Sequence, residues 1–323
     1  MPFSIELRPG FSQCDTAGNV HFPRYMETMN NLVERWFLER MGVDFHAFHL
    51  IDRMGLPVAN TRLDILAPSR LGEALTLEIG VETLGRSSLV VRATGHCGGE
   101  LRFTIRHRLV FISLETYRAI AIPPHLQPGL EAERLEGLAG SPDPVLPSGA
   151  APANAFHTRL VVRTSHCDPA GIVFYARYFE MLAEAQEDWF DRGLLLPLGR
   201  LLRERGRRLV VTGAAAGFER VSRLSDALDI DLWVSAIEGG QFTLSLIASC
   251  EGEVRLRARI EAELHQAEEA HGDHERQDED RDEGDEEHED ERAQSDARGN
   301  AIEAARSDLP EDLREWMGHY FCP

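Results

Sequence analysis

Two segments of the chain carry the apolar spacing of an amphipathic helix. In the second segment, apolar residues recur at positions i, i+3, i+4, i+7 and i+11, namely Tyr178, Met181, Leu182, Ala185 and Trp189. The first segment has a similar stripe, formed by Tyr25, Met29, Leu32, Val33 and Trp36. Such a stripe is typical of a helix that packs one face against a core. We therefore expect two long helices, which end near Gly42 and Gly193.

Each predicted helix is followed by three strand-like segments that are separated by turn residues. They cover 75–81, 88–94 and 101–113 in the first half, and 227–237, 242–250 and 254–264 in the second half. Gly98-Gly99 and Glu251-Gly252 mark tight hairpins. A short extended segment precedes each helix, at 5–7 and at 156–162. One helix and a run of antiparallel strands in each half predict an α+β layout, with the helix packed on the sheet.

The two halves are copies of one unit. The stretch Ser12–Glu27 returns as Ser165–Glu180, an offset of 153 residues that also relates Trp36 to Trp189. An ungapped register over roughly a hundred residues predicts two domains with the same fold. We expect the domains at 1–137 and 156–323, joined by a linker at 138–155 that is rich in Pro, Gly, Ser and Ala.

The charge distribution indicates that the second domain contains an acidic segment without a counterpart in the first. The chain has 323 residues and a formal net charge of −20, and residues 268–292 alone hold 15 acidic and 3 basic side chains. Like charges at this density repel each other, so we expect a disordered acidic insert at about 267–298 within the second domain. Basic patches with interleaved aromatic residues are absent from the sequence, so we do not expect nucleic acid as a partner.

The remaining bulk features predict a cytoplasmic protein with no membrane partner. The sequence has no run of about 18 apolar residues, and residues 1–8 lack the basic start and apolar core of a secretory signal. Four of the five cysteines are repeat equivalents, Cys14 with Cys167 and Cys97 with Cys250. We interpret them as structural thiols in a reducing compartment.

Candidate chemistry lies where a loop leads into the second helix. Asp168 lies in this loop, and Gly171 permits a tight bend and close approach of a ligand. The first N–H groups of the helix, near residues 174–177, carry the positive end of its dipole and would stabilise a developing negative charge. Asp168 beside them could act as a nucleophile or as a base for water, which suits attack on an acyl carbon. The alternative for an isolated aspartate at this place is a simple helix N-cap.

The run Asp168-Pro-Ala-Gly-Ile-Val-Phe-Tyr175, followed by Tyr178-Phe179, resembles the active-site loop of the 4-hydroxybenzoyl-CoA thioesterases. The resemblance covers about residues 3–125 and 156–265. It implies two hotdog domains in tandem, each a curved antiparallel sheet wrapped round a long helix, paired as an internal pseudo-dimer with the site between them. It also implies hydrolysis of an acyl-CoA thioester without a metal or other cofactor. Under this resemblance Asp168 is the catalytic carboxylate, and the backbone N–H of Tyr175 holds the thioester carbonyl, with Gly171 and Phe174 beside the substrate.

The first copy departs from this pattern. It keeps Asp15 and Gly18, but it has His21 in place of Phe174 and Phe22 in place of Tyr175. A backbone donor survives the change from Tyr to Phe, so two interpretations stay open. Asp15 either heads a second working site, with Gly18 and Phe22 beside the substrate, or serves as a structural cap.

Two equivalent arginines, Arg70 and Arg223, follow a serine at the start of a predicted strand in each copy. They could bind the phosphates of CoA, or they could be ordinary exposed residues at a strand edge.

The sequence is compatible with three functional hypotheses. The first is hydrolysis of an aromatic acyl-CoA such as benzoyl-CoA or a hydroxybenzoyl-CoA. The second is a hotdog hydratase acting on an enoyl-CoA, but such enzymes generally pair a histidine with the carboxylate, and the Asp168 loop offers only His166. The third is a non-catalytic acyl-CoA-binding protein. Exposed sheet edges also make a homodimer of double hotdogs an expected assembly.

Overall fold

The computed structural model describes residues 2–136, 140, 142–266 and 309–322. The predicted acidic insert at 267–298 therefore lies outside the described residues.

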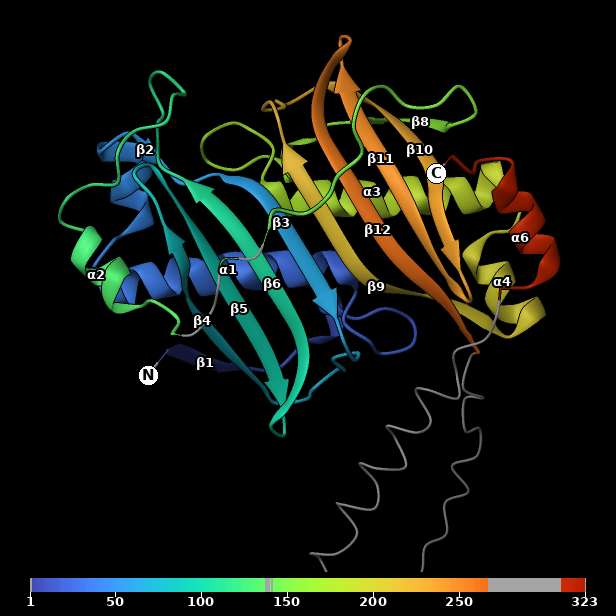
Figure 1. The fold of residues 1–323 in the computed structure, drawn as a ribbon, viewed down its shortest axis with the longest axis horizontal. Coiled ribbons are helices and arrows are strands. Elements are labelled where there is room, and N and C mark those ends of the chain that lie inside the picture. The colour runs from blue at the N-terminus through green and yellow to red at the C-terminus, as the bar shows by residue number, and fades with distance from the viewer. Residues whose placement is uncertain (1, 137–139, 141, 267–308, 323) are drawn as a thin grey trace, which may run out of the picture.

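A single antiparallel sheet of ten strands runs through both halves of the chain (Figure 1). The strand order is β1-β4-β5-β6-β3-β9-β12-β11-β10-β8. The first unit contributes β1 (Phe3–Leu7), β3 (Val58–Ile65), β4 (Leu75–Leu84), β5 (Ser88–Cys97) and β6 (Glu100–Val110). The second unit contributes β8 (Phe156–Val161), β9 (Arg207–Phe218), β10 (Ala227–Glu238), β11 (Gln241–Cys250) and β12 (Glu253–Gln266). A separate two-stranded sheet pairs β2 (Met54–Gly55) with β7 (Ile112–Ser113).

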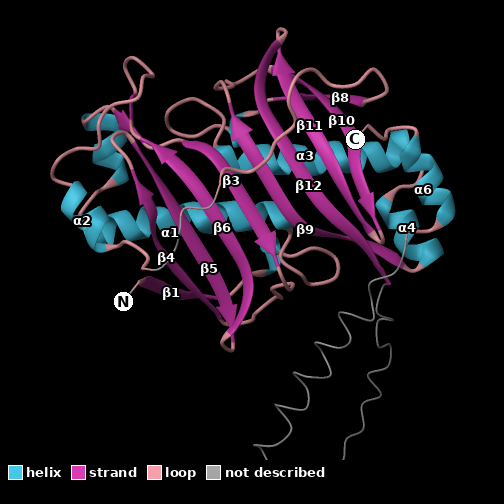
Figure 2. Cartoon of the chain, viewed as in Figure 1, coloured by secondary structure: helices cyan, strands magenta, loops and turns pink. Residues whose placement is uncertain are grey.

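Two long helices lie side by side on one face of the ten-stranded sheet (Figure 2). They are α1 (Phe22–Met41) and α3 (Tyr175–Asp188), and α3 continues into a π-helical turn, η4 (Trp189–Gly193). Their apolar stripes form the core as expected, because Trp36 and Trp189 are both fully buried between helix and sheet. Helix α1 ends at Met41 and is capped by Gly42, whose left-handed φ of 67° is readily adopted by glycine.

Short helical segments complete the fold. In the first unit they are η1 (Phe11–Gln13), the π-helical turn η2 (Ala47–Ile51) and α2 (Gln127–Ala132). In the second unit they are η3 (Thr164–His166), α4 (Leu198–Arg205) and α6 (Glu311–Gly318). Among the described helices, none combines the length and apolarity that a membrane crossing would need.

The two units have the same internal pairing. Cys14 and Val20 form a bridge in the first loop, as Cys167 and Val173 do in the second. Both predicted hairpin turns are confirmed, with positive φ at Gly98 and Gly99 and at the equivalent Glu251 and Gly252. The structure thus confirms two hotdog units in one chain.

The described residues 309–322 belong to the repeated unit. In the first unit Val81 exchanges backbone hydrogen bonds with Glu133 and Leu135, and in the second unit its equivalent Val234 does so with Tyr320 and Cys322. Helix α6 therefore takes the place that α2 has in the first unit.

Strands β3 and β9 join the two units. They pair antiparallel from Asn60 opposite Gly217 to Asp64 opposite Gly213. Across this joint the Arg62 guanidinium makes a two-pronged ion pair with Glu261, at 2.7 and 2.6 Å. Residues 142–155 of the linker cross the sheet face opposite the helices (Figure 1), where Asp143 accepts from Arg108 at 2.8 Å.

A cluster of four charged residues links α1 to α3. Arg24 pairs with Glu27 and Glu180, and Arg177 pairs with the same two glutamates at 2.5 Å each. Arg24 and Arg177 are repeat equivalents, as are Glu27 and Glu180. The cluster therefore maps onto itself when the two units are exchanged, and it marks the axis of the internal pseudo-dimer.

Candidate active site

The Asp168 carboxylate organises its own loop. Its Oδ1 accepts hydrogen bonds from the backbone N–H groups of Ala170 at 2.9 Å and Ile172 at 3.4 Å. Gly171 has a left-handed φ of 77°, as the predicted tight bend requires. The N-cap of α3 is Phe174, and no side chain caps it. Asp168 is therefore not a simple helix cap, and its Oδ2 has no hydrogen bond within the described part of the chain.

The environment of Asp168 makes it a stronger base than an ordinary aspartate. Its side chain is half-buried, and burial raises the pKa of the carboxyl. The N–H groups of Ile172 and Ala170, the charge of His49 and the N–H of Gly171 act in the opposite direction, but the net pKa shift is upward. A carboxylate with a raised pKa gains more from accepting a proton or bonding to carbon than a fully solvated one does.

The first turn of α3 supplies donors for a negative charge. Tyr175 and Ala176 are its first two residues, and their N–H groups have no acceptor within the helix. In the first unit the equivalents are Phe22 and Pro23, and proline has no N–H. The start of α3 therefore offers two adjacent donors, and the start of α1 offers one.

The Tyr175 side chain reaches into the first unit. Its hydroxyl donates to the backbone carbonyl of Met26 at 2.8 Å and lies 3.1 Å from Nε2 of His107. Burial lowers the pKa of His107 to about 3, so this imidazole is neutral at physiological pH. The Tyr175 ring also packs edge-on against Phe174, with centroids 5.1 Å apart. Tyr175 thus begins α3 with its backbone and contacts the opposite unit with its side chain.

Two further first-unit segments face the Asp168 loop. The Arg223 guanidinium lies over the ring of Tyr117, 5.7 Å from its centroid, and Arg223 forms a backbone bridge with Ile172. The charge of His49, in η2, acts on the Asp168 carboxylate. The loop of the second unit is therefore bordered by residues of the first.

The loop of the first unit has the same backbone form but a different setting. Asp15 Oδ1 accepts from Ala17 at 2.9 Å and from Asn19 at 3.0 Å, and Gly18 has a φ of 75°. Asp15 is exposed, whereas Asp168 is half-buried. Phe22 is buried, with 4% of its surface accessible, and has no hydroxyl to bond across the interface.

The two candidate phosphate-binding arginines are exposed. Their backbone N–H groups donate to nearby carboxylates, Arg70 to Glu73 at 2.8 Å and Arg223 to Asp226 at 2.9 Å. The tip of Arg223 lies over Tyr117, so this guanidinium is directed to the face where the two units meet.

Three residues of the first unit that interact with the second unit near the Asp168 loop, His49, Tyr117 and His107, could not be identified from the sequence. Each comes from the first unit, and only the packing of one unit on the other brings it to the second loop. His166, the one histidine that the sequence offered near Asp168, accepts the N–H of Arg163 at 3.0 Å through Nδ1 and so stabilises the local turn. No group of three metal-binding side chains is found in the described ranges.

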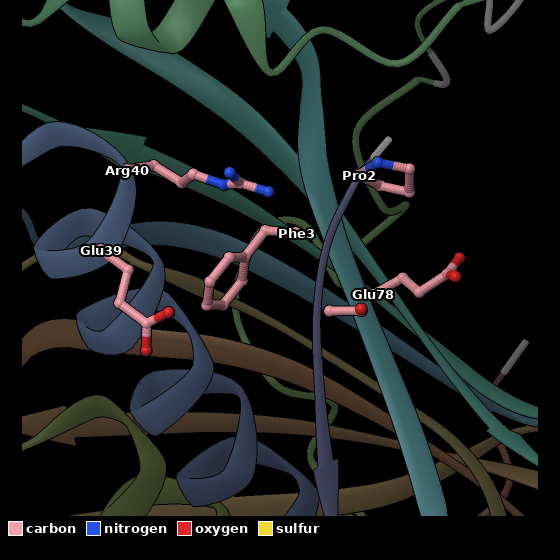
Figure 3. A pocket seen from close by; sticks show the side chains of 6 residues that line it. Pro2, Phe3, Glu39, Arg40 and Glu78 are labelled. Atoms are coloured by element: carbon pink, nitrogen blue, oxygen red, sulfur yellow. The ribbon is translucent and has the colours of Figure 1, made fainter.

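A surface hollow lies away from these residues. It is lined by Pro2, Phe3, Ser4, Glu39, Arg40 and Glu78, between the first strand and the end of α1 (Figure 3). Arg40 lies over the Phe3 ring at 5.5 Å. None of these residues belongs to either aspartate loop, so the hollow is not the candidate active site.

Solved structures with the same fold cover most of this chain. A Lactobacillus plantarum protein, provisionally described as an oleoyl thioesterase, has a TM-score of 0.68 at 18% identity and covers 81% of this chain and 96% of its own. The 12:0-ACP thioesterase from Umbellularia californica has a TM-score of 0.66 at 14% identity, covering 81% and 94%. An acyl-ACP thioesterase from Bacteroides thetaiotaomicron has a TM-score of 0.60 at 15% identity, covering 81% and 97%.

Sequence comparison assigns the family. No curated protein matches the chain. The sequence model of the thioesterase-like superfamily matches residues 9–130 and 162–317, which is most of the chain and includes both aspartate loops. This agrees with the predicted class of thioester hydrolase. The chain belongs to the thioesterase-like superfamily.

Proposed function

We propose that this protein hydrolyses an acyl thioester at Asp168. The observation that carries the proposal is the half-buried Asp168 carboxylate, which has one unbonded oxygen among the described residues and precedes a helix start with two free N–H groups. A carboxylate and a pair of backbone donors are the groups that attack on an acyl carbon requires.

The chemistry follows from these groups. The thioester carbonyl oxygen accepts from the N–H groups of Tyr175 and Ala176, which polarises the carbonyl carbon. Oδ2 of Asp168 either bonds to that carbon or takes a proton from the water that does. The negative charge that develops on oxygen is stabilised at the start of α3. The C–S bond then breaks, and the sulfur leaves and gains a proton. If Asp168 has bonded to the carbon, water next hydrolyses the mixed anhydride, which releases the free acid and regenerates the Asp168 carboxylate. If Asp168 has activated water, the free acid forms directly and carries the oxygen of that water.

For the acyl group we propose an aromatic acyl-CoA, as the resemblance of residues 168–175 implies. Three aromatic rings pack beside the loop, those of Phe174, Tyr175 and Phe218. The ring centroids of Tyr175 and Phe218 are 6.4 Å apart. A fatty acyl thioester is the alternative acyl class. It is favoured by the tandem architecture, since the three structures that cover 81% of this chain are described as oleoyl or acyl-ACP thioesterases.

A second candidate function is hydration of an enoyl-CoA. The sequence argued against it because the Asp168 loop offers only His166. The structure adds His49 from the first unit, whose charge acts on Asp168. A carboxylate with a nearby histidine is also a suitable pair for adding water to a double bond.

Thiol release from a panel of thioesters tests the proposal. The panel comprises benzoyl-CoA, 4-hydroxybenzoyl-CoA, lauroyl-CoA, oleoyl-CoA and lauroyl-ACP, with crotonyl-CoA hydration measured separately by loss of absorbance. We expect thiol release from at least one ester and a loss of about 10³-fold or more in kcat for Asp168→Asn. Thiol release that Asp168→Asn leaves unchanged would overturn the assignment of this residue. Hydration of crotonyl-CoA without thiol release from any ester would favour the hydratase.

Because the chain is a repeat, it provides a matched control for Asp168→Asn in the first unit. Asp15→Asn changes the equivalent residue with the same loop hydrogen bonds. We include Asp15, with Gly18 and Phe22, as a second candidate site, and this variant tests it. A halved kcat for Asp15→Asn would assign a working site to each loop, and an unchanged kcat would assign all activity to Asp168.

A further inference from the structure

A turn of the first unit, residues 113–118, contacts the second unit beside the Asp168 loop. The Tyr117 N–H donates to the Ser113 carbonyl at 2.8 Å and so closes this turn. The Arg223 guanidinium of the second unit lies over the Tyr117 ring, 5.7 Å from its centroid. Arg223 also forms a backbone bridge with Ile172 of the Asp168 loop. One arginine thus joins an aromatic side chain of the first unit to the Asp168 loop of the second.

Two more arginines are attached to the same turn through their backbones. The Arg118 carbonyl accepts the Ser113 N–H at 3.0 Å, and the Arg53 carbonyl accepts the Leu114 N–H at 2.8 Å. Arg53, Arg118 and Arg223 are all exposed, and none of them forms an ion pair with a residue that the structure describes. Three positive charges without carboxylate partners therefore gather at this turn, which favours an anionic ligand.

The backbone at this turn is strained at two of these side chains. Arg53 has a φ of 52° and Tyr117 a φ of 53°, a left-handed conformation that L residues adopt at a cost. The repeat position of Arg53 is Gly206, which has a φ of 57° and pays no such cost. The first unit thus keeps an arginine where the second unit has the glycine that this backbone favours. Strain that is retained at exposed side chains indicates that those side chains have a function.

The chemistry of these side chains fits a nucleotide. A guanidinium that lies over an aromatic ring keeps its N–H groups in its own plane, where they can still bind a phosphate. The Tyr117 side chain is 43% exposed, so its ring can also stack on a second flat group. The nucleotide end of CoA carries a diphosphate, a 3′-phosphate and an adenine, and its flexible pantetheine arm separates them from the sulfur. These groups match arginines and a tyrosine that lie beside the reacting loop.

An acyl carrier protein is the other common carrier of an acyl thioester. It presents the same pantetheine arm on a single phosphate, with no adenine to stack on Tyr117. Carrier proteins of this kind are acidic, and the formal net charge of −20 on this chain opposes their approach. The exposed tyrosine and the charge of the chain therefore favour CoA.

We infer that Arg53, Tyr117, Arg118 and Arg223 form the binding site for the adenine nucleotide end of CoA. Both units contribute to this site, which lies beside the Asp168 loop. The inference rests on the proposed thioester hydrolysis and deepens it, because it assigns CoA as the carrier of the acyl group. Tyr117 stacks on the adenine, and the arginines pair with the phosphates.

Binding of CoA tests the site without turnover. Calorimetric titration of the full chain compares CoA with 4′-phosphopantetheine, which lacks the adenine nucleotide. We expect Tyr117→Ala and Arg53→Gly each to raise the Kd of CoA by about tenfold and to leave the Kd of 4′-phosphopantetheine within about twofold of wild type. Tyr117→Phe keeps the ring and should bind CoA as wild type does. The control is Arg35→Ala, an exposed arginine of α1 that pairs with Glu39, which should change neither Kd.

The stability of the variants separates binding from folding. Arg53→Gly places glycine at a left-handed backbone, as Gly206 does in the second unit, so the Tm should not fall. Loss of CoA binding with an unchanged or higher Tm then reports the Arg53 side chain itself.

Several results would overturn the inference. They are a wild-type chain that does not bind CoA, an unchanged Kd of CoA in both variants, and an equal loss of affinity for CoA and 4′-phosphopantetheine. Tighter binding of a holo-acyl carrier protein than of CoA, weakened by Arg53→Gly, would also overturn it, because the turn would then be a protein docking surface. CoA binding that depends on Tyr117 and Arg53, without thiol release from any ester, would refute the proposed function alone. Thiol release with CoA binding that neither variant changes would refute this inference alone.

Discussion

The hydroxyl of Tyr175 in the second unit donates a hydrogen bond to the backbone carbonyl of Met26 in the first unit, at 2.8 Å. The same residue offers its backbone N–H at the start of α3. One residue therefore bonds across the interface between the units with its side chain and, in the proposed reaction, supplies an oxyanion donor with its main chain.

Tyr175→Phe separates these two roles. The variant keeps the backbone donor, so we expect kcat to stay within about threefold of wild type. It loses the hydroxyl and leaves the Met26 carbonyl and the buried His107 without that partner. The free energy of unfolding should fall by about 1–3 kcal/mol. Denaturant unfolding and steady-state kinetics measure the two effects, and a large loss of kcat with unchanged stability would contradict this division.

The raised pKa of Asp168 sets the acid side of the pH profile. The residue must be ionised to attack or to accept a proton, and burial raises its pKa above the ordinary value of 3.8. We expect kcat/KM to fall with decreasing pH through a single ionisation whose midpoint lies above 3.8. A midpoint at or below the ordinary value would mean that the loop donors outweigh burial.

The same pKa shift predicts that Asp168→Asn stabilises the fold at neutral pH. A carboxyl whose pKa is raised in the folded state binds its proton more tightly there than in the unfolded chain. Its ionisation therefore disfavours the folded state as pH rises from the unfolded pKa through the folded one. Asparagine keeps an Oδ1 acceptor for Ala170 and Ile172 without the charge. Thermal melts at pH 7 should show a higher Tm for the variant, and the difference should vanish below about pH 3.9. A lower Tm at pH 7 would contradict this account.

Gly171 and its repeat equivalent Gly18 allow the cost of a left-handed backbone to be compared in the two loops. Its φ is 77°, and a Cβ built there would meet nothing within 4 Å. Gly171→Ala should therefore cost only the penalty of a left-handed backbone, about 1–2 kcal/mol of unfolding free energy, and Gly171→Asn should cost less. Gly18→Ala, with a φ of 75° and equally open space, should cost the same. A much larger cost at either position would indicate packing that the structure does not show.

Arg223 and Arg70 can be compared for binding of CoA. If Arg223 binds a CoA phosphate, Arg223→Ala should raise KM for the CoA ester by about tenfold and leave KM for the N-acetylcysteamine thioester of the same acid unchanged. Arg70→Ala tests the equivalent exposed position in the first unit. Equal KM changes on both substrates would show that Arg223 acts through Tyr117 and the fold.

The elements with clear periodicity could be predicted from the sequence. The stripes of α1 and α3 match the buried residues, and the strands bounded by Gly98-Gly99 and Glu251-Gly252 form hairpins as expected. The strands that join the units could not be predicted in this way. Strand β9 contains five consecutive Gly and Ala residues at 213–217, a composition with low β propensity, and β3 carries the polar Asn60 and Asp64. These segments are strands because each pairs with the other and with its own unit.

In the candidate site too, some residues could be predicted from the local sequence and others could not. The Asp168 loop was identified because a carboxylate, a glycine and a helix start are neighbours in the sequence. His49 was not identified because it is more than a hundred residues away and has Leu202 at its repeat position. Only the packing of the first unit on the second lets its charge act on Asp168.

The two units that pair through β3 and β9 belong to one polypeptide, and this has an evolutionary consequence. In an assembly of two identical chains, any substitution appears in both halves, so a change that improves one cleft also alters the other. Here the halves belong to one polypeptide, so each position can vary alone. His49 with Leu202, Ala176 with Pro23 and Tyr175 with Phe22 are such independent choices. Covalent fusion thus allows the two halves to diverge independently at equivalent positions.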